Sequence, residues 1–224
     1  MMFRIREVFV LLAISLSIII SSILVFFLVA DSPDILAFSG ESFLRGEFWR
    51  IFTFPFTHVS FDHLIENVFS LFVITMLAYE LGLRGKYFTA SFSLSGFIIA
   101  LANLFLFPAI LIAGASLGIY AVLGSLSIKG SNFIPKYIII PAFALTALVM
   151  PLISMISSPV LNDIMTKSMM FHLSGFAAGI FLFYAFIKLR SRVKVFTGKH
   201  TKEIRPGRRI FSGIRRKKSF LRDL

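Results

Sequence analysis

The feature that most constrains this chain is an apolar run between Lys86 and Lys129 that contains no Asp, Glu, Lys or Arg. A transmembrane helix needs about 20 mostly apolar residues, so this run is too long for one span and suits two. Pro108, in the sequence LFPAI, is the expected turn between them. Hydrophobic residues make up 57% of the chain, more than soluble domains usually contain, so we expect a membrane protein.

Apolar segments on either side of this run complete a prediction of six spans. The segment 8–30 is longer than the apolar part of a signal peptide, and no convincing cleavage site follows it, so we expect it to be the first span. The predicted fold is an all-α membrane protein, a six-transmembrane-helix bundle in one domain, residues 1–190. The predicted spans are 8–30, 61–79, two within 87–128, 137–162 and 168–187.

The distribution of basic residues predicts the orientation of this bundle. Cytoplasmic loops carry an excess of Lys and Arg, and basic residues bound both ends of the uncharged run. Both ends of the run, and with them the N- and C-termini, are therefore predicted to be cytoplasmic in a multi-pass protein of the cell membrane. Residues 31–60 mix charges with many Phe residues and the only Trp, which predicts a structured loop at the membrane interface.

A basic segment, residues 191–224, follows the last predicted span and is expected to be a flexible cytoplasmic tail. It accounts for most of the net charge of +12. Because it follows a span directly, contact with anionic lipid headgroups is a simpler interpretation than nucleic-acid binding. An equally good interpretation is that its charge only keeps this end of the chain in the cytoplasm.

Polar side chains inside a membrane are costly, and several are predicted to lie at similar depth in the outer half of this bundle. Ser116 follows Pro108 by eight residues, which places it about 12 Å down a helix from the outer turn. His172 lies near the outer end of the last span, and His63 and Asn67 share one helix face at the outer end of the second span.

Small residues accompany these polar side chains. Gly114 and Gly118 form a G-x-x-x-G pattern beside Ser116, and Gly175 and Gly179 form another beside His172. Such spacing lets helix backbones approach closely, so the two helices are expected to pack and bring Ser116 within hydrogen-bond reach of His172. A serine with an imidazole base is the minimum for nucleophilic catalysis.

Each of these residues also has a simpler interpretation. A serine between glycines in a membrane helix most often serves packing, and a lone histidine can be a polar contact or part of a proton path in a transporter. A transporter would more often show internal repeats, and the sequence has none. The separation of His58 from His63 does not match a zinc-protease motif, so no metal is expected, and no cofactor is implied.

Four motifs, in order along the chain, make it resemble the rhomboid family of intramembrane serine proteases over roughly residues 8–190. Any one would be weak evidence, but together they are specific. They are E-x-W-R at residues 47–50, H-x-x-x-x-H-x-x-x-N at 58–67, most of G-x-S-G at 114–117 followed by Tyr120, and H-x-x-G-x-x-x-G at 172–179.

The resemblance implies a Ser–His dyad with Ser116 as nucleophile and His172 as general base. It also implies that Tyr120 supports the His172 ring, and that His63 and Asn67 form an oxyanion hole with the Ser116 backbone N–H. His58 would help to hold the first loop or retain water. Trp49 and Arg50 would be structural in that loop. The spans that carry Ser116 and His172 contain no Asp or Glu that could complete a triad.

Two positions depart from the family pattern. Leu117 stands where the family usually has glycine, and its branched side chain could crowd the oxyanion site. Glu66 stands where an apolar residue is expected. Its carboxylate either reaches the lipid headgroups or influences the lateral access of substrate beside the fifth helix.

The function that follows from the resemblance is cleavage of transmembrane segments of membrane proteins near the outer membrane face. The partners implied are transmembrane protein substrates and membrane lipids, with no nucleic acid. The alternative is a weakly active or inactive rhomboid-like factor that binds membrane proteins without cutting them. The sequence predicts no oligomeric state.

Overall fold

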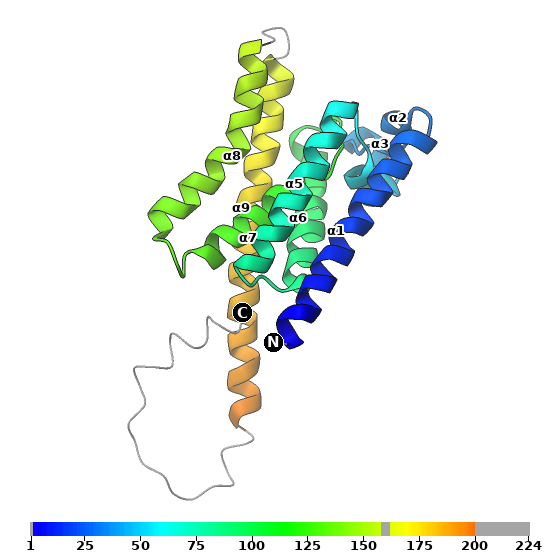
Figure 1. Ribbon diagram of the computed structural model, residues 1–224. Coiled ribbons are helices and arrows are strands. Elements are labelled where there is room, and N and C mark those ends of the chain that lie inside the picture. The colour runs from blue at the N-terminus through cyan, green and yellow to red at the C-terminus, as the bar shows by residue number, and fades with distance from the viewer. Residues whose placement is uncertain (1, 158–161, 200–224) are drawn as a thin grey trace, which may run out of the picture.

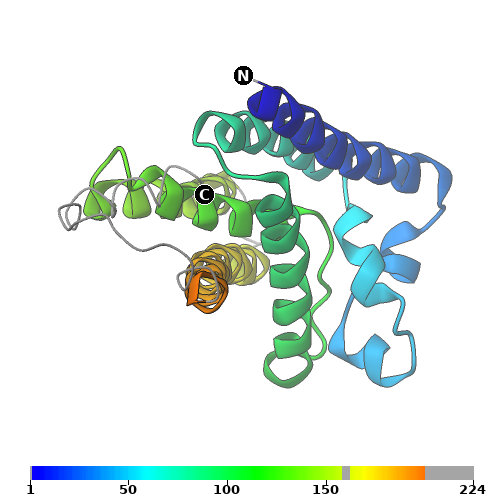
Figure 2. The same cartoon turned by 90° about the horizontal axis from the view of Figure 1, so that it is seen from below.

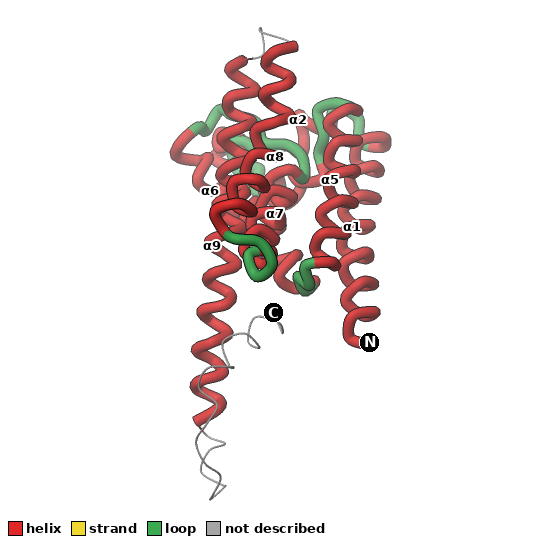
Figure 3. Tube along the Cα trace, turned by 60° about the vertical axis from the view of Figure 1, so that its left-hand side comes forward, coloured by secondary structure: helices red, strands yellow, loops and turns green. Residues whose placement is uncertain are grey.

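A computed structural model describes residues 2–157 and 162–199, and within these ranges the chain is helical (Figure 3). The only strand-like pairing there is an antiparallel bridge between Phe38 and Ile112. The helices are α1 (Met2–Leu28), α2 (Ser32–Leu36), α3 (Gly40–Leu44), α4 (Arg50–Thr53), the 3₁₀ helix η1 (Phe54–Phe56), α5 (Phe61–Glu80), α6 (Gly85–Leu106), α7 (Ser116–Gly130), α8 (Lys136–Ser157) and α9 (Asn162–Lys199).

Four segments of the described chain are long and apolar enough to cross a membrane, judged by length and composition. They are Ile5–Leu28, Phe61–Glu80, Gly85–Leu106 and Thr166–Arg190. The helix α7 is shorter, with 15 residues, and lies inside the bundle, where every residue from 121 to 130 is buried. The start of α1 and the far end of α9 lie at the same end of the molecule (Figure 1).

The second predicted span begins where the sequence places it. The Ser60 hydroxyl caps α5 by accepting a hydrogen bond from the backbone N–H of His63 at 3.2 Å. Serine is a preferred N-cap because its side chain satisfies an N–H that the helix itself leaves free. The start of α5 at Phe61 agrees with the sequence prediction, and this cap fixes where His63 stands in the first turn.

The predicted turn at Pro108 is present, since the Ile110 N–H donates to the Phe107 carbonyl at 3.0 Å, but residues 110–115 then form a non-helical connection before α7. Its backbone groups pair with the first loop instead of forming a helix. Phe38 and Ile112 exchange two backbone hydrogen bonds, of 2.9 and 2.7 Å, and the Gly114 N–H donates to the Phe54 carbonyl at 2.9 Å. Ser116 is therefore the first residue of α7, rather than a residue two turns inside a helix.

The last helix is longer than predicted at both ends. It begins at Asn162, so Lys167 lies in the helix and not in a preceding loop, and it continues past Arg190 to Lys199. Figure 1 shows its final part projecting beyond the other helices. The first residues of the basic segment are thus helical, while residues 200–224 of the predicted flexible tail lie outside the described residues.

The packing of α7 against α9 uses glycines from both helices. A Cβ atom on Gly179 would overlap the Ala121 carbonyl oxygen, and one on Gly175 would lie 2.7 Å from the Leu117 carbonyl oxygen. On the α7 side, a Cβ on Gly124 would overlap the Phe176 carbonyl. The predicted close contact of these helices is present, and side chains larger than hydrogen at these three positions would push the helices apart.

The expected role of the Gly114–Gly118 pair in this contact is wrong. Gly114 lies in the connection before α7, and a Cβ on Gly118 would overlap the Phe92 ring of α6. A spacing pattern identifies small residues but not the neighbour that they accommodate. Gly118 allows α7 to pack on α6, while Gly124 allows it to pack on α9.

Buried hydroxyl groups also connect the central helices. Ser91 of α6 and Ser125 of α7 share a hydrogen bond of 2.8 Å, and the Ser125 hydroxyl donates to the Gly179 carbonyl at 3.1 Å. All three residues are buried. In an apolar interior such bonds hold helices in one register, because breaking them leaves polar groups unpaired.

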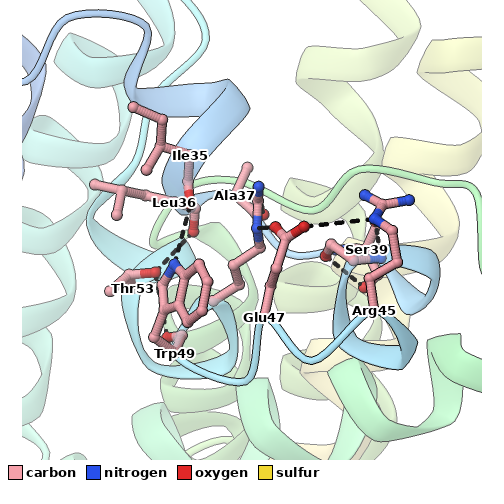
Figure 4. A network of polar contacts seen from close by, with 10 residues as sticks. Ile35, Leu36, Ala37, Ser39, Arg45, Glu47, Trp49 and Thr53 are labelled. Carbon is pink, nitrogen blue, oxygen red and sulfur yellow. Dashed lines mark hydrogen bonds and ion pairs between the residues drawn. The ribbon is translucent and has the colours of Figure 1, made fainter.

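The loop 31–60 is a structured unit of short helices, as predicted. The Trp49 indole N–H donates to the Ile35 carbonyl at 3.2 Å, and the Arg50 guanidinium donates to the Ala37 carbonyl at 2.9 Å (Figure 4). Arg50 also forms an ion pair with Glu47. These contacts fold the loop on itself, and Figure 2 shows it on the opposite side of the molecule from α8.

We expect Gly179→Val to destabilise the protein, because the added side chain would separate α7 from α9. Overpacking of this kind typically costs about 1–3 kcal/mol. Thermal unfolding of the detergent-solubilised protein measures the effect. The matched control is Ala177→Val on the exposed face of the same helix, which introduces the same side chain where no neighbouring helix is in its way. Equal melting temperatures for the two variants would contradict the predicted role of Gly179.

Candidate active site

Ser116 lies at the N-terminus of α7, half-buried, directly after the extended connection. The first backbone N–H groups of a helix have no partner within the helix, and the helix dipole places partial positive charge there. A hydroxyl in this position stands beside backbone donors that can stabilise a negative charge. The sequence predicted the residue but not this setting.

Gly114 brings the α5 residues to this helix end. Its φ of 98° is a left-handed conformation that favours glycine. A Cβ atom on it would lie 2.9 Å from His63 Nε2 and 3.5 Å from Asn67 Nδ2. The His63 ring thus presents its Nε2 edge to the backbone two residues before Ser116, and Asn67 lies beside it.

Asn67 is fixed in this position by its own helix. It is buried, and its Nδ2 group donates to the His63 carbonyl at 2.8 Å. A carboxamide nitrogen carries two hydrogens, so this bond leaves one available. The structure therefore brings together the three predicted donors: His63, Asn67 and the backbone at Ser116.

His172 of α9 meets Tyr120 of α7. Their ring centroids are 4.4 Å apart, and the ring planes are inclined by 31°. Tyr120 follows Ser116 by four residues, so the two side chains lie one turn apart on the same face of α7. Gly175, one turn after His172, lies against the Leu117 carbonyl. These contacts place the His172 turn of α9 alongside the first turn of α7.

The Leu117 side chain has its own place in this arrangement. It is 2% exposed and belongs to a buried apolar cluster formed by the first loop, α6 and the connection before α7. Its neighbours in the cluster include Phe38, Phe54 and Ile112. The Leu117 side chain, which the glycine of the family pattern lacks, therefore packs into the apolar core beneath the first loop.

His58 is almost fully buried behind His63. Its Nδ1 atom lies 3.3 Å from the Phe56 carbonyl, and its ring centroid lies 5.2 Å from that of His63 in an edge-on arrangement. Burial, reinforced by the neighbouring His63, lowers the pKa of His58 to about 4. The imidazole is therefore neutral at neutral pH and contributes a hydrogen-bonding group without charge.

Trp49 and Arg50 do not join these residues. Their polar groups bind the carbonyls of Ile35 and Ala37, so they stabilise the first loop from within. That loop in turn pairs with the connection that ends at Ser116. The contribution of both residues to the site is indirect, as the sequence motif suggested.

One buried polar residue near this region was not singled out from the sequence. Asn103 of α6 is 1% exposed, and its Nδ2 group donates to the Ile110 carbonyl at 3.2 Å. It lines a cavity of about 120 Å³ between α6 and α9, to which Ser174 also contributes. The only signal in the sequence was a single carboxamide in a long uncharged run.

The arrangement can support acyl transfer by a serine. It offers a hydroxyl at a helix N-terminus, an imidazole held by an aromatic ring on the next turn, and neutral donors from α5. Among the described residues, no three His, Asp or Glu side chains come together as a metal site would need. The hydroxyl, the imidazole and the neutral donors are the groups that nucleophilic catalysis by a serine uses.

Comparison with known families matches this chain to the family model described as Rhomboid domain, over residues 45–189. The match covers more than half of the chain and includes α5 to α8, α9 up to residue 189, and every residue placed at the site above. Comparison with curated proteins gives no significant match.

We expect the stability of the protein to fall as the pH is lowered from about 6.5 to 4. In this range an unfolded His58 binds a proton, whereas the folded one with a pKa of about 4 does not, so protons favour unfolding. The resulting loss is at most about 3 kcal/mol and is absent above pH 6.5. It is measured as the melting temperature in detergent at pH 7 and pH 4.5.

The control for this prediction is His58→Gln, which cannot titrate. Its melting temperature is expected to depend less on pH than that of the unmodified chain, although its stability at pH 7 can be lower. A parallel pH dependence in the two proteins would show that His58 is not the group responsible.

Proposed function

The chain belongs to the rhomboid family, and from this premise we propose that it is an intramembrane serine endopeptidase whose nucleophile is Ser116 and whose general base is His172. The contact between Tyr120 and His172 is the observation that carries the proposal. It holds the imidazole on the face of α7 that begins with Ser116. A packing serine would not require an aromatic ring on its own helix that supports a histidine on the neighbouring helix.

In the proposed reaction, His172 accepts the Ser116 proton while the Ser116 Oγ attacks the carbonyl carbon of the scissile bond. The negative charge that develops on the carbonyl oxygen is stabilised by the Ser116 N–H, His63 Nε2 and Asn67 Nδ2. His172 then donates the proton to the leaving amine. Water, activated by the same imidazole, hydrolyses the acyl-enzyme and restores the serine.

The positions of the donors support this assignment. His63 Nε2 and Asn67 Nδ2 lie against the Gly114 backbone, and the helix N-terminus contributes the third donor from the nucleophile's own residue. All three belong to rigid or capped elements, so they need little rearrangement when charge develops. His58 supports His63 from behind as a neutral group.

A cavity beside the site offers a place for an apolar substrate side chain. It measures about 270 Å³ and is bounded by the first loop, α6 and the start of α7. Gly114 and Gly118 form its wall on the side of Ser116, and Phe54 and Phe92 are among its other lining residues. Pockets with such linings bind apolar groups well.

The membrane setting of the proposed enzyme follows from the fold. The chain is an integral membrane protein, and we propose that it spans the cell membrane six times with both termini in the cytoplasm. The start of α1 and the far end of α9 lie at the same end of the molecule, which supports this topology. Transmembrane proteins would be the substrates, and their helices must unwind locally, because helical hydrogen bonds shield the scissile carbonyl. The basic segment after α9 would contact anionic lipid headgroups.

The central test compares cleavage of a single-pass transmembrane reporter by the purified chain with cleavage by Ser116→Ala and His172→Ala. Both variants are expected to lose cleavage, by about a thousandfold or more, because the two residues act as one unit. Asn67→Ala is expected to lose about a hundredfold, since it removes one of three oxyanion donors.

Two controls make this test decisive. Melting temperatures of the variants are expected to match that of the unmodified chain within a few degrees, and a fluorophosphonate probe is expected to label Ser116 only in the folded protein. Cleavage that survives Ser116→Ala would overturn the proposal. An unmodified chain that binds the reporter but does not cut it would favour the non-proteolytic alternative.

A further inference from the structure

Glu66 is an exposed carboxylate in the outer part of α5, a helix whose other acids are Asp62 in its first turn and Glu80 at its last residue. Among the side chains that the structure describes, Glu66 forms no ion pair, whereas Glu47 of the first loop pairs with Arg45 and Arg50. An acidic group in a membrane-spanning segment is costly, so an unpaired one is a candidate for function.

The position of Glu66 on α5 distinguishes it from the lipid-facing residues. The exposed face of the helix includes Ile65, Phe69 and Phe72. Glu66 lies at the edge of this face, three residues after His63 and therefore on the His63 side of the helix. Its carboxylate stands where the lipid-facing surface meets the candidate active site.

Tyr120, one turn after Ser116, joins α7 to α8 and α9. Its hydroxyl donates to the Thr146 carbonyl of α8 at 3.3 Å. The Tyr120 ring also packs on His172. Because α5 packs against α7, Glu66, one turn after His63, borders the route by which a segment arriving from lipid between α5 and α8 would reach Ser116.

We propose that Glu66 is a specificity-determining residue that pairs with a Lys or Arg of the substrate close to the scissile bond. This inference rests on the proposed function. Neighbouring positions on a helix face are about 5–6 Å apart, and an extended chain rises about 3.3 Å per residue. A cation within about three residues of the scissile bond can therefore reach Glu66 while the scissile carbonyl lies at His63 and Asn67.

The physical basis is the cost of charge in a membrane. A lysine or arginine in the outer part of a transmembrane segment is disfavoured in lipid, and so is the Glu66 carboxylate. Bringing the two together removes both penalties at once, whereas a neutral substrate leaves the carboxylate unpaired. The predicted substrate class is therefore a transmembrane segment with a basic residue beside the bond that is cut.

The experiment measures kcat/KM for matched transmembrane reporters that differ at one residue. Lys, Gln or Glu is placed in turn at each position within about three residues of the scissile bond. We expect the unmodified chain to prefer Lys over Gln by about tenfold at one of these positions, or about 1.4 kcal/mol. Glu66→Gln is expected to reduce this ratio to less than about twofold, and Glu66→Lys to favour the Glu reporter instead.

Asp62→Asn is the matched control, because Asp62 is an exposed acid one turn before Glu66 on α5 and, as the residue next to His63 in the sequence, points to a different side of the helix from His63. Asp62→Asn is expected to keep the preference for Lys. A Lys-to-Gln ratio that is the same in the unmodified chain and in Glu66→Gln at every position would overturn the inference. That result would leave Glu66 as a group that only reaches the lipid headgroups.

A binding measurement separates failure of this inference from failure of the proposed function. The reporters are titrated into Ser116→Ala in nanodiscs, with and without Glu66→Gln, so no cleavage is needed. Tighter binding of the Lys reporter that depends on Glu66 would support the inference even if no chain cuts. Cleavage of every reporter at equal rates, with equal affinities, would refute the role of Glu66 and leave the protease assignment intact.

Discussion

The backbone contact between α7 and α9 is the constraint on which the candidate site depends. Gly124, Gly175 and Gly179 each lie against a carbonyl of the opposite helix, so the two axes cannot approach in this way with larger residues. This contact sets the register that places His172 on Tyr120. The Ser125 bond to the Gly179 carbonyl fixes the same register with a polar interaction. Packing and catalytic geometry are therefore one arrangement.

The connection before α7 contributes the second half of the site. Its extended backbone pairs with Phe38 and Phe54 of the first loop, which satisfies polar groups that would otherwise be buried without partners. The left-handed Gly114 then turns the chain into α7 directly under the His63 ring. The internal contacts of Trp49 and Arg50 matter because they support the loop that holds this connection.

The sequence predicted the features that depend on local composition. A charge-free run, the mostly apolar segment 61–79 and four ordered motifs were enough for the helical membrane fold, the start of α5 and the identity of the candidate residues. It mispredicted the setting of Ser116, because the apolar residues 110–115 were expected to belong to the helix that follows the turn at Pro108. Their extended form depends on bonds to Phe38 and Phe54, which lie far away in the sequence. The partner of Gly118 was unpredictable for the same reason.

The groups beside the proposed oxyanion position are neutral, and the charged carboxylate of α5 lies away from it. His58 is buried and neutral, and a neutral His63 with hydrogen on Nε2 can donate to an oxyanion, which leaves its Nδ1 as an acceptor. That Nδ1 is buried and has no hydrogen-bond partner among the described residues, a cost of about 1–3 kcal/mol that sites of function often retain. The full negative charge of Glu66 lies instead at the exposed edge of α5. The uncharged donors His63 and Asn67 face the position where the negative charge of the oxyanion would develop. The Glu66 carboxylate lies further away, where it can pair with a cation of the substrate and does not repel the oxyanion at close range.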